Sequence, residues 1–315
     1  MVPLQSQRKR LSWPSLTGRC VVSCTMVLLT QFALSLVPRF LPTSPLLIQL
    51  SLSVVLMLVV VGLGGLFRRL LGIHASAPAL VFFNILFIWC FYVLIIRKGL
   101  SLVMDVVFNG EVVLLLTGLC SMLKSDPGLV EPSFSDKLVE SSASEIITAH
   151  NEDSDFGRRV RYCKICKGYI KGFDHHCPAF GNCIGQKNYL LFMVLLVGFL
   201  VTEACYLACS SEYAVKSGTS SMLSSETSLS ENLAVSTRIF SILQLVWQVA
   251  FFTWHLYGIC FNIRTDEWVN WKKYPEFQLI VQYQPGQSST EIRFTNPHDK
   301  GILQNVKEFM SLEKR

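Results

Sequence analysis

Charged residues are scarce in this chain of 315 residues: only 16% are Asp, Glu, Lys or Arg, whereas 51% are hydrophobic. A soluble protein of this length needs more charged surface, so the composition favours a polytopic membrane protein. The net charge of +6 is modest, and no aromatic-basic stacking motif accompanies it. The modest charge and the lack of such a motif argue against a nucleic-acid partner. They leave anionic lipid or a phosphate-bearing ligand as the partner of the basic residues.

Long apolar runs take the place of charged surface. They cover Cys20–Val37, Pro45–Phe67, Ala77–Ile96, Leu102–Leu123, Tyr189–Cys209 and Ala234–Phe261. A helix needs about 20 apolar residues to cross a bilayer, so these runs predict an all-α integral membrane protein with about six transmembrane helices. The fourth run contains Asp105 and Glu111, which must face protein or water. A cleavable signal peptide is the alternative for the first run, but a second full span follows almost at once.

The basic residues predict the orientation. They gather in the N-terminal segment, between the fourth and fifth spans, and in the tail, and positive residues favour the cytosol. The predicted organisation is a cytosolic segment (1–19), four spans (20–123), a cytosolic loop (124–188), two spans (189–261) and a cytosolic tail (262–315). The Ser-rich loop Ser210–Asn232 would then be luminal. Arg97 and Lys98 would also be luminal, which conflicts with the rule unless they snorkel to the interface.

The cysteines outside the apolar runs cluster in the predicted cytosolic loop. In a reducing compartment such a cluster indicates a metal site or catalysis more than disulfides. Cys163 and Cys166 form a C-x2-C pair, and His176 and Cys183 follow. This closed set of three thiols and one imidazole predicts one structural Zn2+, which would fold a polar loop that is too short for its own core. A chance cluster of free thiols is the alternative.

Cys177 is one thiol too many for a tetrahedral zinc site. A cysteine needs a base or a nearby positive charge to become a thiolate at neutral pH. His175 can take the proton, and Asp174 can fix the imidazole tautomer, as in other histidine-activated nucleophiles. The cluster predicts thiol-based acyl transfer beside the membrane. The sequence alone leaves open whether the two imidazoles, His175 and His176, exchange these roles.

At these residues the chain resembles the DHHC family of protein S-acyltransferases, also called palmitoyltransferases. The motifs that carry the resemblance follow in the family's order around the spans: Asp126-Pro127-Gly128, Asp174-His175-His176-Cys177, Asn182-Cys183-Ile184-Gly185, Arg264-Thr265-Asp266-Glu267, and Asn296-Pro297-His298-Asp299-Lys300-Gly301 with Asn305. The fourth motif lacks the first threonine that the family usually has. Only about the first hundred residues lie outside the resemblance.

The resemblance implies a two-step reaction. Cys177 would take a long-chain acyl group, most commonly palmitoyl, from acyl-CoA and pass it to a cysteine of a cytosol-facing substrate protein near the bilayer. A basic run suits the CoA phosphates; its members are Arg158, Arg159, Arg161, Lys164, Lys167 and Lys171. Orientation by the positive-inside rule is the simpler reading for any one of them. The family also suggests an endomembrane location, Golgi or ER, with the plasma membrane as the alternative.

The chain departs from the family at a first zinc site. Its four positions correspond here to Ala149, Glu152, Tyr162 and Tyr169, none of which replaces a thiolate or imidazole, so we expect one zinc ion and a reduced cysteine-rich domain. Ala179 also stands where the family usually has a tryptophan. These losses favour an alternative function, a catalytically weak or silent membrane adaptor. The filled metal set argues against a zinc hydrolase, because no position remains for water.

Overall fold

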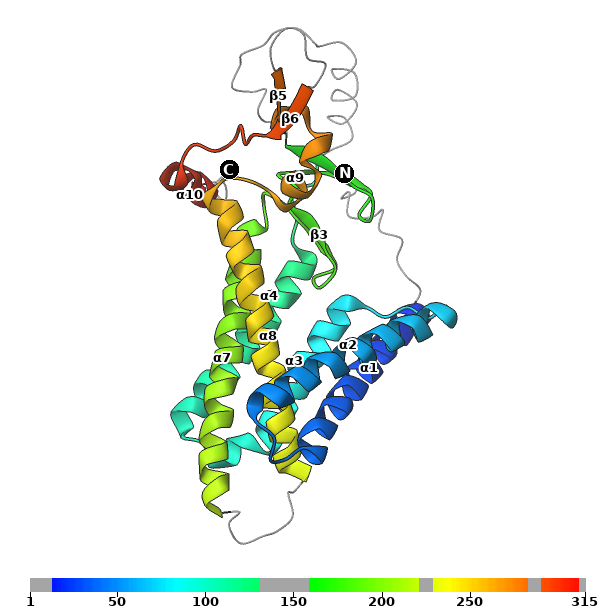
Figure 1. Ribbon diagram of the computed structural model, residues 1–315, viewed down its shortest axis with the longest axis vertical. Coiled ribbons are helices and arrows are strands. Elements are labelled where there is room, and N and C mark those ends of the chain that lie inside the picture. Colours follow the sequence, from blue (N-terminus) through cyan, green and yellow to red (C-terminus); the bar gives the residue numbers. More distant parts are fainter. Residues whose placement is uncertain (1–12, 131–158, 221–228, 283–289, 312–315) are drawn as a thin grey trace. The chain divides into compact units, whose positions relative to one another are not determined.

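The computed structural model describes residues 13–130, 159–220, 229–282 and 290–311. Six helices in this part of the chain are long and apolar enough to cross a membrane by length and composition. They are α1 (Trp13–Phe40), α2 (Leu46–Leu70), α3 (Ala77–Leu94), α4 (Leu102–Lys124), α7 (Tyr189–Ser220) and α8 (Leu229–Cys260) (Figure 1). The prediction of a mostly helical multi-pass membrane protein with six spans is therefore confirmed.

Several helices extend beyond the apolar runs that predict them. α1 begins at Trp13 rather than near Cys20, and α7 continues to Ser220. Because α8 begins at Leu229, most of the expected Ser-rich loop is helical, and only residues 221–228 between the two helices lie outside the described residues. Apolar composition marks where a helix can cross lipid, whereas a helix can continue into water as long as its backbone hydrogen bonds persist.

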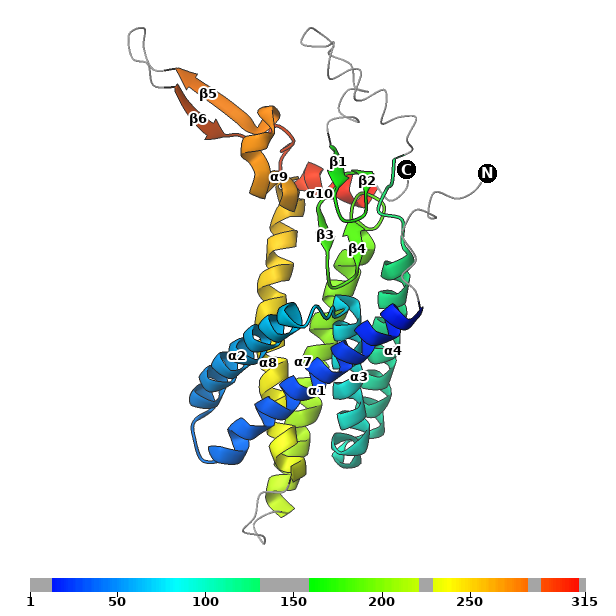
Figure 2. The ribbon, with the colours of Figure 1, turned by 90° about the vertical axis from the view of Figure 1, so that its right-hand side faces the viewer.

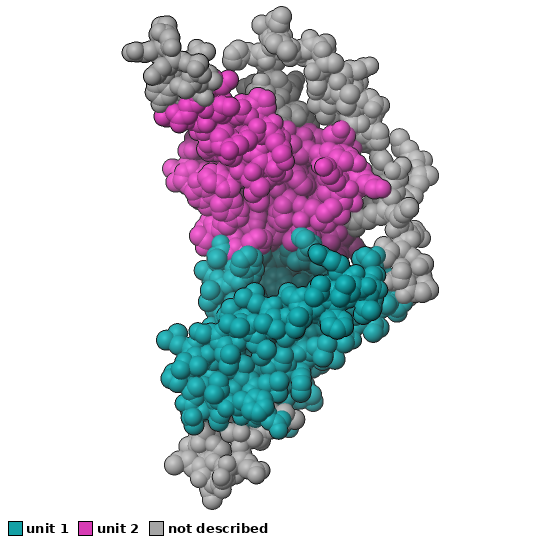
Figure 3. Space-filling view, turned by 45° about the vertical axis from the view of Figure 1, so that its right-hand side comes forward, with its two compact units in different colours: residues 1–120, 178–180, 195–250 teal, residues 121–177, 181–194, 251–315 magenta. Residues whose placement is uncertain are grey.

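The chain divides into two compact units, coloured separately in Figure 3. The first contains residues 1–120, 178–180 and 195–250, and the second contains residues 121–177, 181–194 and 251–315. The first unit is built from α1, α2, α3 and the adjoining parts of α4, α7 and α8. The second unit holds the Cys/His cluster of the predicted loop.

Asp105 of α4 has hydrogen-bond and charge partners inside the first unit. Asp105 is buried and accepts hydrogen bonds from Tyr92 Oη at 3.1 Å, Asn109 Nδ2 at 2.9 Å and Arg97 Nε at 2.9 Å. Arg97 belongs to η2 (Ile96–Gly99), between α3 and α4. This ion pair gives Arg97 a partner at the helix end, so its conflict with the predicted orientation has a local structural reason.

Among its described residues, the second unit contains three two-stranded antiparallel sheets and two short helices (Figure 2). The strands are β1 (Val160–Cys163), β2 (Gly168–Lys171), β3 (His175–Cys177), β4 (Asn182–Ile184), β5 (Gln278–Gln282) and β6 (Thr290–Phe294), paired in that order. The helices are α9 (Thr265–Asn270) and α10 (Ile302–Ser311), and the 3-10 turns η4 (Trp271–Lys273) and η5 (Pro275–Phe277) follow α9. Strands this short cannot bury a large core, which makes a bound metal an expected source of their stability.

Two of the sequence motifs lock the strands to the end of α4. Asp126 Oδ1 accepts the backbone N–H groups of Gly128 and Leu129, both at 2.9 Å, and Gly128 has a φ of 100° that favours glycine. A Cβ atom on Gly185 would collide with the carbonyl oxygen of Pro127. The glycine of the Asn182–Gly185 motif thus lets the Asp126–Gly128 turn pack directly against the backbone after β4.

Two asparagine side chains complete this junction. Asn182 Nδ2 donates to the carbonyl oxygens of Met122 at 3.0 Å and Ser125 at 2.9 Å, at and just after the end of α4. Asn188 Nδ2 donates to the Cys183 carbonyl at 2.9 Å, while its Oδ1 accepts the Gly185 N–H at 2.9 Å. The β3–β4 hairpin is therefore fixed at its second strand before any metal is considered.

Candidate active site and metal centre

Four thiol and imidazole groups converge between the two hairpins. Cys163 ends β1, Cys166 lies in the β1–β2 turn, His176 is the middle residue of β3, and Cys183 is the middle residue of β4. His176 Nδ1 lies 3.9, 3.4 and 3.5 Å from the Sγ atoms of Cys163, Cys166 and Cys183. The Sγ atoms of Cys166 and Cys183 are 3.4 Å apart. The structure thus brings together all four residues that the sequence proposes as metal ligands.

These spacings match the edges of a small tetrahedron. With Zn–S bonds near 2.3 Å and Zn–N bonds near 2.0 Å, tetrahedral zinc requires ligand atoms about 3.5–3.8 Å apart. The backbone N–H of Cys166 also points to Cys163 Sγ at 3.4 Å, a bond that stabilises a thiolate in a C-x2-C turn. The donor set and its geometry fit a structural Zn2+, and the cluster could hold such an ion without rearrangement.

The backbone of β3 separates the two adjacent histidines. Successive side chains of a strand point to opposite faces, so His175 and Cys177 share one face and His176 lies on the other. The register with β4 pairs His176 with Cys183 and Cys177 with Asn182. His176 therefore faces the cysteine ligands, and His175 faces the side of Cys177. The strand groups His176 with the cysteines and His175 with Cys177, and the roles of the two imidazoles stay a prediction.

Asp174 and His175 form a short charged contact. His175 Nδ1 lies 2.7 Å from Asp174 Oδ2, and Asp174 has no exposed surface. Burial alone would raise the pKa of Asp174, but the hydrogen bond and positive charge of His175 outweigh it and hold that pKa at about 2. Burial likewise opposes charging of His175, yet its hydrogen bonds to Asp174 and Cys177 raise its pKa to about 9. The pair therefore favours an ionised Asp174 and an imidazolium beside the thiol at neutral pH.

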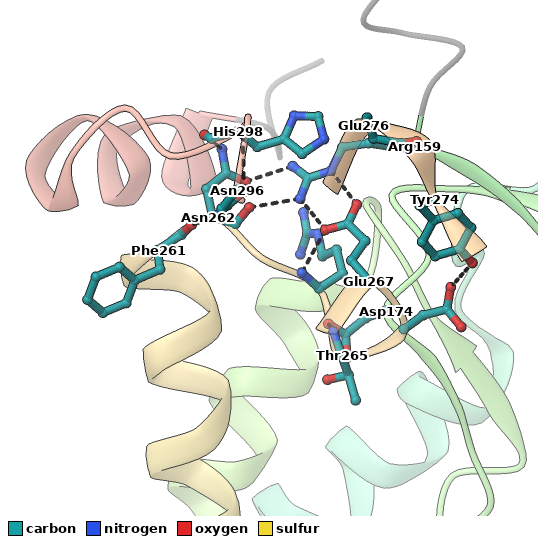
Figure 4. Close-up of polar contacts among 12 residues, drawn as sticks. Arg159, Asp174, Phe261, Asn262, Thr265, Glu267, Tyr274, Glu276, Asn296 and His298 are labelled. Carbon is teal, nitrogen blue, oxygen red and sulfur yellow. Dashed lines mark hydrogen bonds and ion pairs between the residues drawn. The ribbon is translucent and has the colours of Figure 1, made fainter. Parts of the chain in front are cut away.

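The backbone after α8 holds Asp174 from another side. Asp174 Oδ1 accepts the N–H of Thr265 at 3.0 Å, and the carbonyl oxygen of Asp174 accepts the N–H of Asp266 at 2.9 Å. These donors are among the first N–H groups of α9, which have no partner within the helix. Figure 4 shows Thr265 and Asp174 at this contact. The segment that carries the threonine of the family motif thus orients the acid of the site.

A second imidazole lies beside this pair. His255, on α8, has only 1% of its surface exposed, and its Nδ1 lies 3.9 Å from Asp174 Oδ2. Its ring is 5.5 Å from the His175 ring, centre to centre, and tilted by 33°. Tyr189 Oη lies 3.2 Å from His255 Nδ1. The sequence marks His255 only as an ionisable residue in an apolar span, 80 positions after His175, and favours packing on an aromatic-rich helix face, so it does not predict this contact.

An arginine–glutamate pair ties the first hairpin to the segment after α8. Arg159 Nε donates to Glu267 Oε1 at 2.7 Å, and Arg159 Nη2 donates to Glu267 Oε2 at 2.6 Å (Figure 4). Arg159 also donates to the side chain and carbonyl of Asn262 at 2.7 and 2.9 Å. Burial alone would raise the pKa of Glu267, but the hydrogen bonds and charge of Arg159 outweigh it and hold that pKa below its ordinary value.

The six basic residues proposed for CoA do not share one environment. Arg158 lies outside the described residues, and Arg159 is occupied by Glu267 and Asn262. Arg161 Nη2 donates to Glu276 at 2.8 Å, and its guanidinium lies 3.9 Å from the centre of the Tyr274 ring. Lys164 and Lys167 are exposed in the β1–β2 turn, and Lys171 at the end of β2 is half-buried. Arg159 and Arg161 therefore each have an acidic partner among the described residues.

The positions projected for a first zinc site are only partly described. Ala149 and Glu152 lie outside the described residues, whereas Tyr162 and Tyr169 face each other across the β1–β2 hairpin. Their rings are 5.1 Å apart, centre to centre, a packing distance for aromatic pairs. A tyrosine pair thus occupies two of the four positions, and the reduction to one zinc ion stays a prediction.

Comparisons with known proteins point in the same direction as the site. Residues 153–272 match the family model described as DHHC palmitoyltransferase. Palmitoyltransferase ZDHHC17 of Mus musculus is 28% identical over 160 residues, which cover 48% of this chain and 24% of that protein. Probable protein S-acyltransferase 6 of Arabidopsis thaliana is 26% identical over 151 residues, 48% of this chain and 32% of that protein.

A fungal protein gives a similar result. Palmitoyltransferase AKR1 of Mortierella alpina is 30% identical over 127 residues, which cover 37% of this chain and 23% of that protein. The chain matches 24%, 32% and 23% of the length of these three relatives, so the similarity concerns one part of much longer proteins. Residues 153–272, which match the family model, contain the Cys/His cluster, Asp174 and Cys177.

Proposed function

This chain belongs to the DHHC palmitoyltransferase family, and we propose that it transfers a long-chain acyl group from acyl-CoA to cysteine thiols of substrate proteins. The palmitoyl group is the acyl group that the family name indicates. Cys177 is the proposed nucleophile, His175 the proposed base and Asp174 the residue that orients it. The contact that carries the proposal is the 2.7 Å pair of His175 Nδ1 and buried Asp174 Oδ2, on a strand that turns His175 and Cys177 to one face.

The first half-reaction acylates the enzyme. Asp174 holds the Nδ1 proton of His175, so Nε2 is the nitrogen that can exchange a proton with Cys177. The Cys177 sulfur attacks the thioester carbonyl carbon, the bond from that carbon to the CoA sulfur breaks, and His175 returns the proton to the departing CoA thiol. An imidazolium beside the sulfur favours its thiolate form.

The second half-reaction transfers the acyl group. A thiol of the substrate protein gives its proton to His175 and attacks the acyl carbon held by Cys177. The bond between that carbon and the Cys177 sulfur breaks, and the proton moves from His175 to Cys177. Both half-reactions need one general acid–base group that changes role, which suits an imidazole held in one tautomer.

One structural Zn2+ is proposed at Cys163, Cys166, His176 and Cys183. It would supply folding energy to two hairpins whose strands have three or four residues each. Since all four positions are protein ligands, the ion has no open position for substrate. In this proposal the metal stabilises the strand that carries the chemistry and takes no part in it.

We also propose where the acyl chain, the CoA phosphates and the substrate proteins would bind. The acyl chain would lie among the spans, where each buried CH2 contributes about 0.8 kcal/mol. Lys164, Lys167 and Lys171, with Arg158, remain proposed partners of the CoA phosphates; Arg159 and Arg161 would serve only by leaving their acidic partners. Substrate proteins would present cysteines from the cytosol near the bilayer, in Golgi or ER membranes as the resemblance suggests.

Acyl loading of the purified protein in detergent tests the proposal. Wild type and Cys177→Ser are incubated with an alkyne-tagged palmitoyl-CoA, and zinc is quantified in both. We expect a hydroxylamine-sensitive label on wild type and none on Cys177→Ser, with equal zinc content because Cys177 is not a ligand. Equal labelling of the two proteins, or no labelling while zinc is retained, would overturn the proposal and support the adaptor function.

A further inference from the structure

His255 is a buried imidazole with one unused nitrogen. Its residue surface is 1% exposed, and among the described residues Nε2 has no hydrogen-bond partner. Buried polar atoms are nearly always paired, so an orphan at the centre of a site calls for a missing partner. The rings of Phe192 and Phe251 contact His255 edge to face, at 4.8 and 4.6 Å between centres. Neither ring offers an acceptor to Nε2.

The inference assigns the Tyr189 phenol as the donor to Nδ1 of His255. The phenol oxygen of Tyr189 lies 3.2 Å from Nδ1, whereas Asp174 Oδ2 is 3.9 Å away, beyond hydrogen-bond length. A phenol O–H that donates to Nδ1 leaves the ring proton on Nε2. With that assignment, Nε2–H is a donor with no acceptor among the described residues. A donor with these properties is suited to an oxygen that arrives with the substrate.

The thioester carbonyl oxygen is the oxygen that the reaction brings. The His255 ring lies 5.5 Å from the ring of His175, which hydrogen-bonds to Cys177. A thioester in position for attack has its carbonyl carbon about 3–3.5 Å from the Cys177 sulfur, next to the His175 ring. In the tetrahedral intermediate, the electrons of the C=O bond move to that oxygen, where a fixed donor stabilises the charge.

We propose that His255 is a third catalytic residue, which donates from Nε2 to the thioester carbonyl oxygen while Tyr189 fixes its tautomer. This inference rests on the proposed acyltransferase function. It gives the transition state a donor that the Asp174–His175–Cys177 set lacks, since His175 is occupied with proton transfer. The alternative role is indirect: His255 would only support Asp174 and His175 by packing.

A sulfur-for-oxygen exchange in the substrate separates the two roles. Loading rates are measured with palmitoyl-CoA and with its dithioester analogue, whose C=S sulfur is a weak hydrogen-bond acceptor. Loss of one oxyanion donor slows a reaction about a hundredfold or more. We therefore expect His255→Ala to slow loading from palmitoyl-CoA about a hundredfold in the rate at saturation, with the half-saturating concentration little changed. Loading from the dithioester should slow only a few-fold.

Further variants protect the test against misfolding. His255→Gln keeps an N–H donor and should retain more activity than His255→Ala, and Tyr189→Phe should show a smaller loss with the same preference between substrates. Phe251→Leu loosens the packing around His255 without removing a donor, and zinc content reports the fold of every variant.

Three outcomes bear on the inference. Equal slowing with both substrates, or slowing by Phe251→Leu equal to that of His255→Ala, would overturn it in favour of packing. Unchanged loading by His255→Ala would also overturn it. A wild-type protein that loads from neither substrate fails the proposed function itself, which is visible before any variant of His255 is compared.

Discussion

Removing the negative charge of Glu267 should detach the first hairpin from the segment after α8. In Glu267→Gln the Arg159 guanidinium keeps its position but loses its counterion, and the two side chains are only 17% and 2% exposed. Removal of one partner of a buried pair costs about 3–5 kcal/mol, and the partial exposure of Arg159 favours the lower end, about 3 kcal/mol. The docked arrangement should weaken by more than a hundredfold, since about 1.4 kcal/mol is tenfold.

Zinc release during heating, followed with a chromogenic chelator, measures this loss. We expect Glu267→Gln to release zinc at a clearly lower temperature than wild type. Glu276→Gln removes the negative charge from a more exposed pair with Arg161 and should cost about 1 kcal/mol or less. Glu291 pairs with Arg293 at an exposed site, so Glu291→Gln should release zinc at the same temperature as wild type.

A double variant tests whether the loss of stability comes from leaving the Arg159 charge without a partner. Arg159→Met with Glu267→Leu removes both charges, and apolar replacement of a whole buried pair is often neutral. The double variant should therefore release zinc at a higher temperature than Glu267→Gln alone. If Glu267→Gln and Glu291→Gln behave alike, or if the double variant is the least stable of all, the pair does not hold the hairpin and the reasoning is wrong.

The remaining predictions concern pH, the acid of the site and the metal. Because the pKa of Glu267 lies below its ordinary value, its ion pair contributes stability above the unfolded pKa of about 4.3 and loses it as the pH falls through the folded pKa. The difference in melting temperature between wild type and Glu267→Gln should therefore shrink between pH about 5 and 3, and a difference that grows on acidification would contradict this. Asp174→Asn should reduce acyl loading of Cys177 about a hundredfold or more at unchanged zinc content, as judged by gel fluorescence and elemental analysis. Undiminished loading would remove Asp174 from the mechanism. Cys183→Ser should lower the zinc content below one ion per chain and expose β3 and β4 to protease, whereas Cys177→Ser should keep full zinc. Full zinc in Cys183→Ser would exclude Cys183 as a ligand.

Much of the architecture could be predicted from local sequence. The six spans follow from apolar composition alone, since lipid leaves a helix few alternatives. The metal cluster follows from residue type and spacing, because Cys163 and Cys166 can meet only through a tight turn. The helix ends were harder to predict. For example, α7 continues to Ser220 through residues that are too polar to be recognised as part of a span.

The long-range contacts of the site could not be predicted in the same way. The pairing of Arg159 with Glu267 joins residues 108 apart, and the contact of Tyr189 with His255 joins residues 66 apart. A single sequence records neither distance. The division of labour between His175 and His176 was also undecided, because it depends on whether the Asp174–Cys177 motif is a strand, a helix or a loop.

The two-residue alternation of β3 has a consequence for metal loss. A hairpin of this length has few hydrogen bonds to define its register, and a slip of one residue would turn every side chain of β3 to the opposite face. His176 would then lie on the face that Cys177 now occupies, and Cys177 would lie on the face of the cysteines proposed to bind zinc. Zinc bound to His176 and Cys183, which oppose each other across the hairpin, forbids that slip. Bound zinc would thus keep β3 and β4 in their observed register. Its removal would allow a folded hairpin with a shifted register as well as an unfolded one.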